Sequence, residues 1–273
     1  MIIAQISDPH IVAPGTLLYG RIDTAGFLTR AVGELSRLDP LPDIVVITGD
    51  LVDKGTPAEY DHLRRLLAPL TMAVFVIPGN HDSREALRAA FGGDGYLPRD
   101  GFLQYLVEDW PLRLIALDTL VPGEGGGELC ADRLLWLDRT LSAAPDRPTL
   151  VMMHHPPFAT GIARMDRAGL RDSDAFAAVI ARHSQVERIL CGHLHRAIDR
   201  RFAGTIAGTA PSTAHQMHLD LRAGAPLRFM FEPPGYQLHL WRDGGLVSHT
   251  AVFGDWPGPY PLRAEAPQGL SGS

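Results

Sequence analysis

Five short stretches of the sequence end in side chains that bind metal ions: Asp8-Pro9-His10, Gly49-Asp50, Gly79-Asn80-His81-Asp82, His154-His155 and Gly192-His193-Leu194-His195. They offer carboxylates, imidazoles and an amide but no thiolate, a donor set that suits hard or borderline divalent ions. Two such ions side by side activate water and polarise a phosphoryl oxygen. The residue types therefore point to the chemistry of a two-metal hydrolase.

The residues that must position these side chains form short apolar runs. Four of the five stretches follow directly on a β-branched run, and Asn80 lies one Pro-Gly turn beyond another. Such runs are typical of strands covered on both faces. We expect strands at residues 2–7, 43–48, 73–77, 112–117, 149–153 and 186–191. Functional sites of α/β sheets gather outside the carboxyl ends of strands, so the five groups are predicted to share one pocket.

Helical patterns separate the expected strands. Apolar residues recur at three-to-four spacing over 27–38, and Thr56-Pro57-Ala58-Glu59 is a capping box that opens a second helix. We expect Asp132 to cap the next helix, and Ser173 or Asp174 to cap the one that runs to His183. The alternation of strands and helices predicts a layered α/β fold.

The character of the chain changes after about residue 204. Strand-like runs at 229–231, 237–241 and 246–252 are followed by a Pro/Gly-rich end. We expect a core over residues 1–203, then a region over 204–258 that completes the second sheet and forms a small lid or contact surface. An irregular tail is expected over 259–273.

Composition excludes several classes of partner. A chain of 273 residues with 45% hydrophobic content buries a full core, and its charge of −6 is dispersed. It lacks the basic runs that bind polymeric nucleic acid, and Cys130 and Cys191 fit no disulfide framework or zinc-thiolate spacing. No apolar run reaches the ~18 residues of a membrane span, and no leader precedes the first strand, so we expect a cytoplasmic protein without membrane contacts.

The spacing of the candidate ligands suggests how two ions would share them. Asp8 and His10, like His193 and His195, are two positions apart, which places both side chains on one side of an extended segment. Asp50 has two carboxylate oxygens and is the natural bridge. One ion is then predicted to take Asp8, His10, Asp50 and His195, and the other Asp50, Asn80, His154 and His193.

The same residues suggest a mechanism, which we state as a hypothesis. A hydroxide held between the ions would attack the phosphorus atom in line. His81 follows Asn80 and is expected to face the phosphoryl group, where it stabilises charge or protonates the leaving alkoxide, with Asp82 orienting it. His155 is expected to be structural, and Asp53 is either a hydrogen-bond acceptor for an imidazole or a simple loop residue.

Each motif alone is a weak signal, but their order is specific. Asp-x-His, Gly-Asp, Gly-Asn-His-Asp, His and Gly-His-x-His over residues 8–195 resemble the calcineurin-like metallophosphoesterase superfamily. Within it, the chain is similar to bacterial class III cyclic-nucleotide phosphodiesterases and the related glycerophosphodiesterases. Residues 18–23, 154–157 and 213–216 resemble the glycerophosphodiesterase branch.

The resemblance implies a four-layer α/β/β/α sandwich with two divalent ions, and the family divides its ligands as predicted above. Iron, manganese, cobalt and zinc all suit this donor set. The resemblance also places His215 near the substrate, beside Asn80 and His81, and suggests homo-oligomers built through the C-terminal region.

The expected substrate is a small phosphodiester, such as a glycerophosphodiester or a cyclic nucleotide, because the cleft segments offer His81 and His215 rather than an arginine pair for a monoester dianion. Two alternatives stay open. A metal-dependent phosphomonoesterase would use the same ligands. A non-catalytic scaffold on the same fold would have lost His81 or several ligands, all of which this sequence retains.

Overall fold

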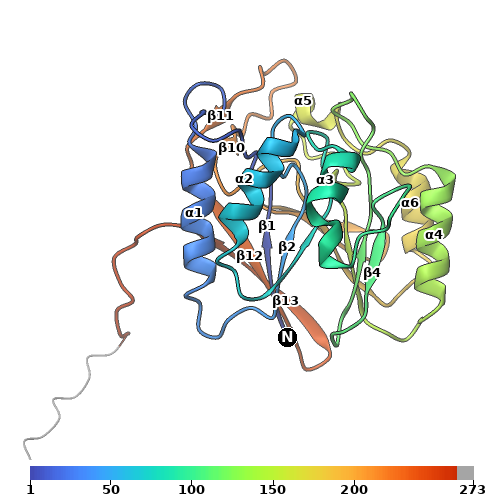
Figure 1. Ribbon diagram of the computed structural model, residues 1–273. Coiled ribbons are helices and arrows are strands. Elements are labelled where there is room, and N and C mark those ends of the chain that lie inside the picture. Colours follow the sequence, from blue (N-terminus) through green and yellow to red (C-terminus); the bar gives the residue numbers. More distant parts are fainter. Residues whose placement is uncertain (263–273) are drawn as a thin grey trace, which may run out of the picture.

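Two β-sheets pack face to face, and helices cover the outer face of each (Figure 1). The computed structural model describes residues 1–262. The first sheet runs in the order β13–β12–β1–β2–β3, and the second in the order β4–β5–β6–β7–β9–β8. This arrangement confirms the predicted α/β class with four layers.

The predicted strands are all present. In the first sheet they are β1 (Ile2–Ile6), β2 (Ile44–Ile47), β3 (Ala73–Val76), β12 (Gly235–Arg242) and β13 (Gly245–Val252). In the second sheet they are β5 (Arg113–Ala116), β6 (Thr149–Met152) and β7 (Val186–Cys191). The second sheet also contains strands that were not expected: β4 (Tyr105–Val107), β8 (Ile198–Phe202) and β9 (Thr205–Thr209).

The direction of the strands brings the motifs together. β1, β2 and β3 are parallel, and so are β5, β6 and β7. Their carboxyl ends lie at the upper edge of both sheets in Figure 1. Each motif sits in the connection that follows one of these strands, so five distant segments meet there.

Alternation of side chains along the strands builds the layers. In β6, Leu150 and Met152 belong to the apolar cluster shared with the first sheet. Val151 and Met153 point the other way, into a cluster with the helices on the outer face. Successive side chains of a strand face opposite sides, so a run that is apolar at every position is buried on both.

The helices lie on the two outer faces. α1 (Thr24–Leu35), α2 (Pro57–Leu67) and α3 (Arg84–Phe91) cover the first sheet, and α4 (Ala131–Ser142) and α6 (Ser173–Ile180) cover the second. A short helix, α5 (Ala163–Asp166), lies near the strand ends, and a 3-10 turn spans Gly92–Asp94.

One predicted helix cap is confirmed and two are wrong. The hydroxyl of Thr56 accepts a hydrogen bond from the Glu59 amide, and Glu59 reciprocates, as in a capping box. The cap of α4 is Cys130 instead of Asp132, and the cap of α6 is Asp172 instead of Ser173 or Asp174. Asp132 and Asp174 lie in the first turns, where a carboxylate also favours a helix.

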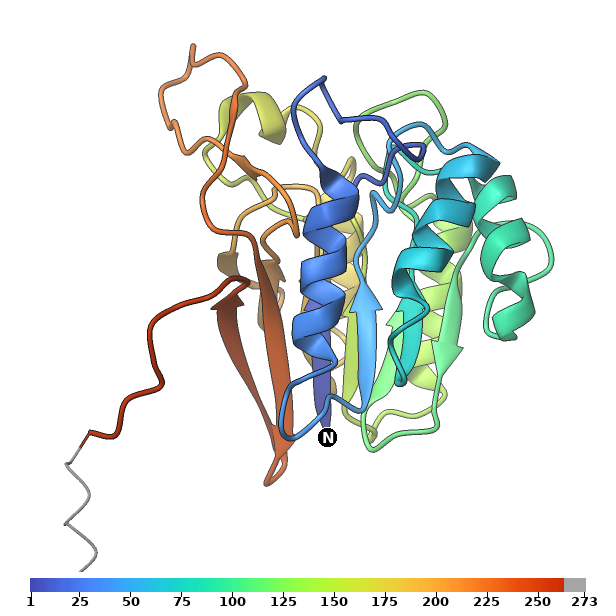
Figure 2. The ribbon, with the colours of Figure 1, turned by 60° about the vertical axis from the view of Figure 1, so that its left-hand side comes forward.

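The C-terminal part contributes to both sheets. β9 pairs with β7, and the β12–β13 hairpin extends the first sheet beside β1. A two-stranded ribbon, β10 (Gln216–Met217) with β11 (Phe229–Met230), and its long loop project beyond the strand ends (Figure 2). The division into regions 1–203 and 204–258 stays a prediction, and the predicted tail at 259–273 lies outside the described residues from 263 onward.

No helix within residues 1–262 combines the length and the apolar composition that a bilayer crossing requires.

Candidate metal centre

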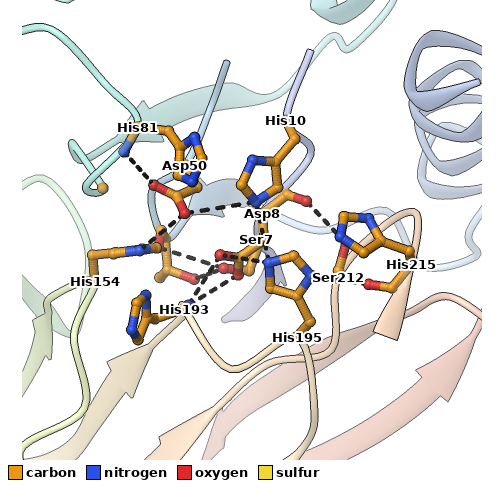
Figure 3. A network of polar contacts seen from close by, with 12 residues as sticks. Ser7, Asp8, His10, Asp50, His81, His154, His193, His195, Ser212 and His215 are labelled. Atoms are coloured by element: carbon orange, nitrogen blue, oxygen red, sulfur yellow. Dashed lines mark hydrogen bonds and ion pairs between the residues drawn. The ribbon is translucent and has the colours of Figure 1, made fainter. Parts of the chain in front are cut away.

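The side chains from the five motifs meet in one buried cluster at the strand ends (Figure 3). Asp8 and His10 follow β1, and Asp50 follows β2. Asn80 lies beyond β3, His154 beyond β6, and His193 and His195 beyond β7. Asp8, His10, Asp50, His154, His193 and His195 are all buried. The structure therefore brings together every residue of the predicted ligand set.

One group of ligand atoms comprises Asp8, His10 and His195. The Nε2 atoms of His10 and His195 lie 3.1 Å apart, and His195 Nε2 lies 3.5 Å from Asp8 Oδ1. Nδ1 of His195 is 3.0 Å from the carbonyl oxygen of His215, so it carries the proton and leaves Nε2 as an acceptor. Two imidazole nitrogens and a carboxylate oxygen thus face one point, as metal ligands do.

A second group lies on the other side of Asp50. Asp50 Oδ2 is 3.6 Å from His10 Nε2 and 3.4 Å from His154 Nε2, so the carboxylate stands between the two groups. Nε2 of His154 is also 3.2 Å from Asn80 Oδ1, and its Nδ1 donates to the carbonyl oxygen of Thr48 at 2.8 Å. This is the geometry expected of a bridging Asp50 with a ligand set on each side.

His193 supplies the test of whether these residues fit metal ions. Its side chain is buried, and Nε2 has no hydrogen-bond partner among residues 1–262. Leaving such an atom unpaired costs free energy, whereas a metal ion would satisfy it. The neighbouring ring of His154 lies 5.1 Å away, centroid to centroid. The cluster fits a divalent ion in chemistry and in placement.

The backbone at the site is strained. Asp8, His10, Asp50, His193 and His195 all have positive φ, with values of 51°, 44°, 48°, 70° and 50°. Residues other than glycine adopt this left-handed region at a cost of roughly 1–3 kcal/mol each, and such strain clusters at functional sites. The left-handed turns redirect the chain where each strand ends, so that the side chains enter the cluster.

Two glycines allow the segments to approach one another. A Cβ atom on Gly49 would lie 2.4 Å from His154 Nδ1, and one on Gly192 would lie 2.3 Å from Ser7 Oγ. Gly49 also has a φ of +90°, which is unfavourable for other residues. Both positions therefore require glycine for the strand ends to pack this closely.

Burial and charge set the protonation states in the cluster. Burial lowers the pKa of His10 and of His193 to about 3, and it also lowers the pKa of His195. These imidazoles are neutral near pH 7, the form that binds metal. Burial raises the pKa of Asp8 to about 7, with a further contribution from the nearby Asp50 carboxylate. Placing two carboxylates together in a buried site favours cations beside them.

Asp50 and His154 form a tightly linked pair. Burial opposes the charge on each, but their mutual attraction outweighs it. The pKa of Asp50 is held well below its usual range, and the pKa of His154 is raised to about 9. A divalent ion would take the place of the proton on His154, because metal binding to imidazole releases protons.

His81 lies at the mouth of the cluster and is half-buried. Its amide donates to Asp50 Oδ1 at 2.9 Å, and its Nδ1 donates to the Asp53 carbonyl oxygen at 2.8 Å. Burial alone would lower the pKa of His81, but Asp50 and Asp53 raise it. Its ring stands 4.7 Å from that of His10, centroid to centroid. The Asp53 carbonyl oxygen thus anchors Nδ1, and the His81 ring stands beside the candidate ligands.

The predicted orientation of His81 by Asp82 is wrong. The Asp82 carboxylate accepts hydrogen bonds from the amides of Gly79 and Leu51 and from the hydroxyl of Tyr60, at 2.8, 3.1 and 2.7 Å. Asp53, which the sequence left open, orients His81 instead. Asp82 ties the turns after β2 and β3 together, so it positions Asp50 and Asn80 through the backbone.

Two further histidines flank the cluster. His215 is 1% exposed, and its ring lies 4.6 Å from that of His195 and 5.8 Å from that of His10. His155 accepts a hydrogen bond from Thr119 Oγ1 at Nδ1 and donates from Nε2 to the carbonyl oxygen of Gly125. Both ring nitrogens of His155 are therefore engaged within the protein, as expected of a structural residue.

The sequence interpretation missed Asp118 and Ser212. Asp118 follows β5 and is fully buried. Its carboxylate accepts two hydrogen bonds, of 2.6 and 2.8 Å, from the guanidinium of Arg84 at the start of α3. This pair anchors the segment that follows His81. A carboxylate at the exit of a strand was the signal used for the other motifs, and it would have found Asp118. Ser212 donates a hydrogen bond to the Asp8 carbonyl oxygen at 2.9 Å. A single serine outside any motif gives no sequence signal of this role.

Comparison with known proteins identifies the family. The calcineurin-like phosphoesterase family matches residues 1–197. The chain belongs to this family. A relative described as a probable glycerophosphodiester phosphodiesterase GpdQ, from Arcobacter nitrofigilis, is 38% identical over 267 residues, covering 97% of this chain and 98% of the relative.

Another relative of similar length carries a different name. A 3',5'-cyclic adenosine monophosphate phosphodiesterase CpdA from Pseudomonas aeruginosa is 34% identical, covering 93% of this chain and 91% of that protein. Among solved structures, a dimetal phosphatase from Danio rerio superposes with a TM-score of 0.62 at 15% identity, covering 93% of this chain and 99% of that one. This last likeness concerns the calcineurin-like fold alone. The family and the His/Asp clusters together fit two divalent metal ions.

Proposed function

We propose that this calcineurin-like protein is a phosphodiesterase that hydrolyses small phosphodiesters at a binuclear metal centre. The observation that carries the proposal is the Asp50 carboxylate, which stands within 3.6 Å of His10 Nε2 and 3.4 Å of His154 Nε2. Asp8, His10 and His195 would hold one ion, Asn80, His154 and His193 would hold the other, and the Asp50 carboxylate would be shared between them. Full-length relatives named as phosphodiesterases support the diester substrate.

When bound, the two ions supply Lewis acidity and a nucleophile from water at neutral pH. The chain's own residues supply the rest. Burial opposes a charge on His81, but the nearby Asp50 and Asp53 raise its pKa and so favour the protonated ring, whose Nδ1 donates to the Asp53 carbonyl oxygen. Nε2 is then free to donate to a phosphoryl oxygen or to the leaving alkoxide. Asn80 and His215 flank the same space and contact the substrate.

The substrate group is a glycerophosphodiester or a cyclic nucleotide, the two kinds of diester that name the relatives. The native ions are iron, manganese, cobalt or zinc, since oxygen and imidazole donors accept all four. A cytoplasmic location and assembly into a homo-oligomer also remain proposals.

The test combines metal analysis with a substrate panel. Purified protein is stripped of metal, reloaded with each of the four ions and analysed for metal content, with about two ions per chain expected. Each form is assayed with bis(p-nitrophenyl) phosphate and p-nitrophenyl phosphate. We expect clear preference for the diester. A clear preference for the monoester would establish the phosphomonoesterase alternative, and the absence of both activities in the loaded protein would refute the enzyme proposal.

The physiological class is tested with the same loaded protein. Turnover of sn-glycero-3-phosphoethanolamine is compared with that of 3',5'-cyclic AMP by product analysis. Hydrolysis of either identifies the relative whose activity this chain shares, and hydrolysis of neither directs the search to other small diesters.

A further inference from the structure

A hollow lined by apolar side chains opens beside the candidate metal centre. Tyr19, Met217, Leu227 and Phe229 contribute its walls, and Arg228 and His215 also line it. The walls come from two distant segments: Tyr19 from the loop before α1, and the others from the β10–β11 ribbon and its loop. We call this space the aromatic hollow.

The aromatic hollow is continuous with the candidate site through His215. That residue lines the hollow, and its ring also lies 4.6 Å from the ring of His195. His215 is 1% exposed, yet its Nδ1 has no hydrogen-bond partner within residues 1–262. A buried polar atom without a partner indicates that something outside the chain completes this place.

The walls are flat and exposed. The rings of Tyr19 and Phe229 are stacked at 5.7 Å, with an interplanar angle of 29°, and Phe229 also meets the ring of His215 at 5.4 Å. Tyr19 is 59% exposed and Leu227 is 46% exposed. Tyr19 also has a positive φ of 51°, so the chain holds this ring at a cost in backbone energy.

A second hollow shares Tyr19 as a wall but has a different lining. It mixes apolar residues, such as Leu17 and Leu18, with the charged Asp53, Lys54 and Glu59. The rings of Tyr19, Phe229 and His215 all line the aromatic hollow, whereas the second hollow has only that of Tyr19 among its lining residues. A flat group therefore meets more aromatic surface in the aromatic hollow.

We propose that the aromatic hollow receives the organic arm that stays on the phosphate after hydrolysis, and that this retained arm is a flat apolar group such as an aryl ring or a nucleobase. The proposal rests on the proposed phosphodiesterase function and narrows its substrate class to diesters whose retained arm is flat. Aromatic side chains stack on flat groups with little dependence on their exact structure, so the preference covers a class of arms.

The experiment uses two diesters with the same leaving group. Methyl p-nitrophenyl phosphate and phenyl p-nitrophenyl phosphate both release p-nitrophenolate and differ only in the retained arm. The measured quantity is the ratio of kcat/KM for the phenyl over the methyl diester in metal-loaded protein. Comparing this ratio between variants cancels the intrinsic reactivity of the two compounds.

We expect Phe229→Ala to lower this ratio by about tenfold, the effect of removing contact with one aromatic group. Phe229 lies in β11, so the substitution also risks the ribbon. Leu227→Ala serves as a second variant, because Leu227 lies in the loop outside the strands, and a fall of about threefold is expected. Leu219→Ala is the matched control, since Leu219 is 52% exposed in the same loop and does not line the hollow.

A binding measurement accompanies the kinetics. Calorimetric titration with phenyl phosphate and methyl phosphate, the products that retain each arm, gives the ratio of dissociation constants in the wild type and in the Phe229→Ala variant. We expect the preference for phenyl phosphate to fall by a similar factor in the variant.

The outcomes separate the two proposals. Hydrolysis of both diesters with ratios unchanged in Phe229→Ala and Leu227→Ala would overturn the aromatic hollow and leave the phosphodiesterase intact. An equal fall in the Leu219→Ala control would also overturn it, because the preference would then come from the loop in general. Failure of the loaded wild type to hydrolyse either diester would instead remove the proposed function.

Discussion

The bodies of the strands and their carboxyl ends follow opposite rules. Within β1, Ile3, Ala4 and Ile6 are buried and apolar in regular extended backbone. A few residues later, Asp8 and His10 are equally buried but polar, and both have positive φ. The end of β7 repeats the contrast, since Ile189, Leu190 and Cys191 are buried and apolar and are followed by His193 and His195.

This difference shows that stability and the candidate chemistry depend on different parts of each strand. The strand bodies bury apolar surface, which stabilises the fold. The strand ends hold carboxylates and imidazoles in strained backbone, an arrangement that persists only because the rigid sheets on both sides fix it. The first sheet supplies both carboxylates and the second sheet supplies His154, His193 and His195, so neither sheet forms the cluster alone. Stability and chemistry therefore reside in adjacent parts of the same strands.

The largest effect is expected when the carboxylate of Asp50, which lies between the two groups of ligand atoms, is neutralised. We expect Asp50→Asn to lower metal content below two ions per chain and to lower kcat/KM by at least ~10³-fold, since a bound ion contributes several kcal/mol of charge stabilisation. Metal analysis and diester assays measure both effects. Asp138→Asn, which removes a carboxylate from the surface of α4, is the control and should leave both values unchanged.

The second prediction concerns a strand-end residue that is not a ligand. His81→Ala should leave metal content at two ions and lower kcat by about 10²-fold, the usual contribution of a proton donor. Steady-state kinetics with metal analysis distinguish this variant from a ligand variant. His249→Ala removes an exposed histidine from β13 and serves as the control. Normal kcat in the His81→Ala variant would exclude His81 from the reaction.

Much of this contrast could be predicted from the sequence. Apolar β-branched runs locate the strand bodies, and an Asp or His directly after such a run locates a strand end, so the convergence of Asp8, Asp50 and His193 follows from topology alone. The short strand β8, with the sequence Ile-Asp-Arg-Arg-Phe, was missed because three of its five residues are exposed and it lacks an apolar run.

The direction of individual side chains could not be predicted in the same way. Asp82 is adjacent to His81 in sequence, yet its carboxylate turns toward Gly79, Leu51 and Tyr60. Asp53, 28 residues before His81, provides the carbonyl oxygen instead. The outcome depends on how the turns after β2 and β3 pack against each other, which the local sequence does not encode. The prediction that Asp132 caps α4 was wrong for a similar reason, because spacing alone cannot distinguish the N-cap residue from a residue in the first turn.

The third prediction tests a buried histidine within a strand body. His239 in β12 is fully buried and hydrogen-bonds to Gln5 Oε1 and Ser248 Oγ. Burial, with a smaller effect from Arg188, lowers its pKa to about 3. The unfolded chain, with an ordinary histidine pKa near 6.5, binds a proton first as the pH falls. The stability contribution is thus present above pH 6.5 and is lost progressively between pH 6.5 and pH 3.

His239→Gln removes this titration and retains a hydrogen-bonding side chain. Between pH 7 and pH 5, the wild type should lose about 2 kcal/mol of unfolding free energy relative to the variant. Urea unfolding of both proteins at each pH gives the difference, in which the histidines of the metal centre cancel because both proteins contain them. A difference that does not change with pH would show that His239 is not held neutral by the strand body.

The smallest expected effect comes from the capping box at the start of α2, which packs next to the strand ends. The Thr56 hydroxyl caps α2, and Glu59 Oε2 accepts hydrogen bonds from the amides of Thr56 and Lys54, both at 3.1 Å. Because Lys54 adjoins Asp53, this capping box also holds the turn that orients His81. Thr56→Ala should lower the unfolding free energy by about 1 kcal/mol, and Thr56→Ser should restore it. If kcat also falls in the alanine variant at unchanged metal content, the turn at Asp53 depends on the cap. If kcat is unchanged, the packing of the two sheets is sufficient to hold the strand ends. The cap would then contribute to the stability of the fold and not to the reaction.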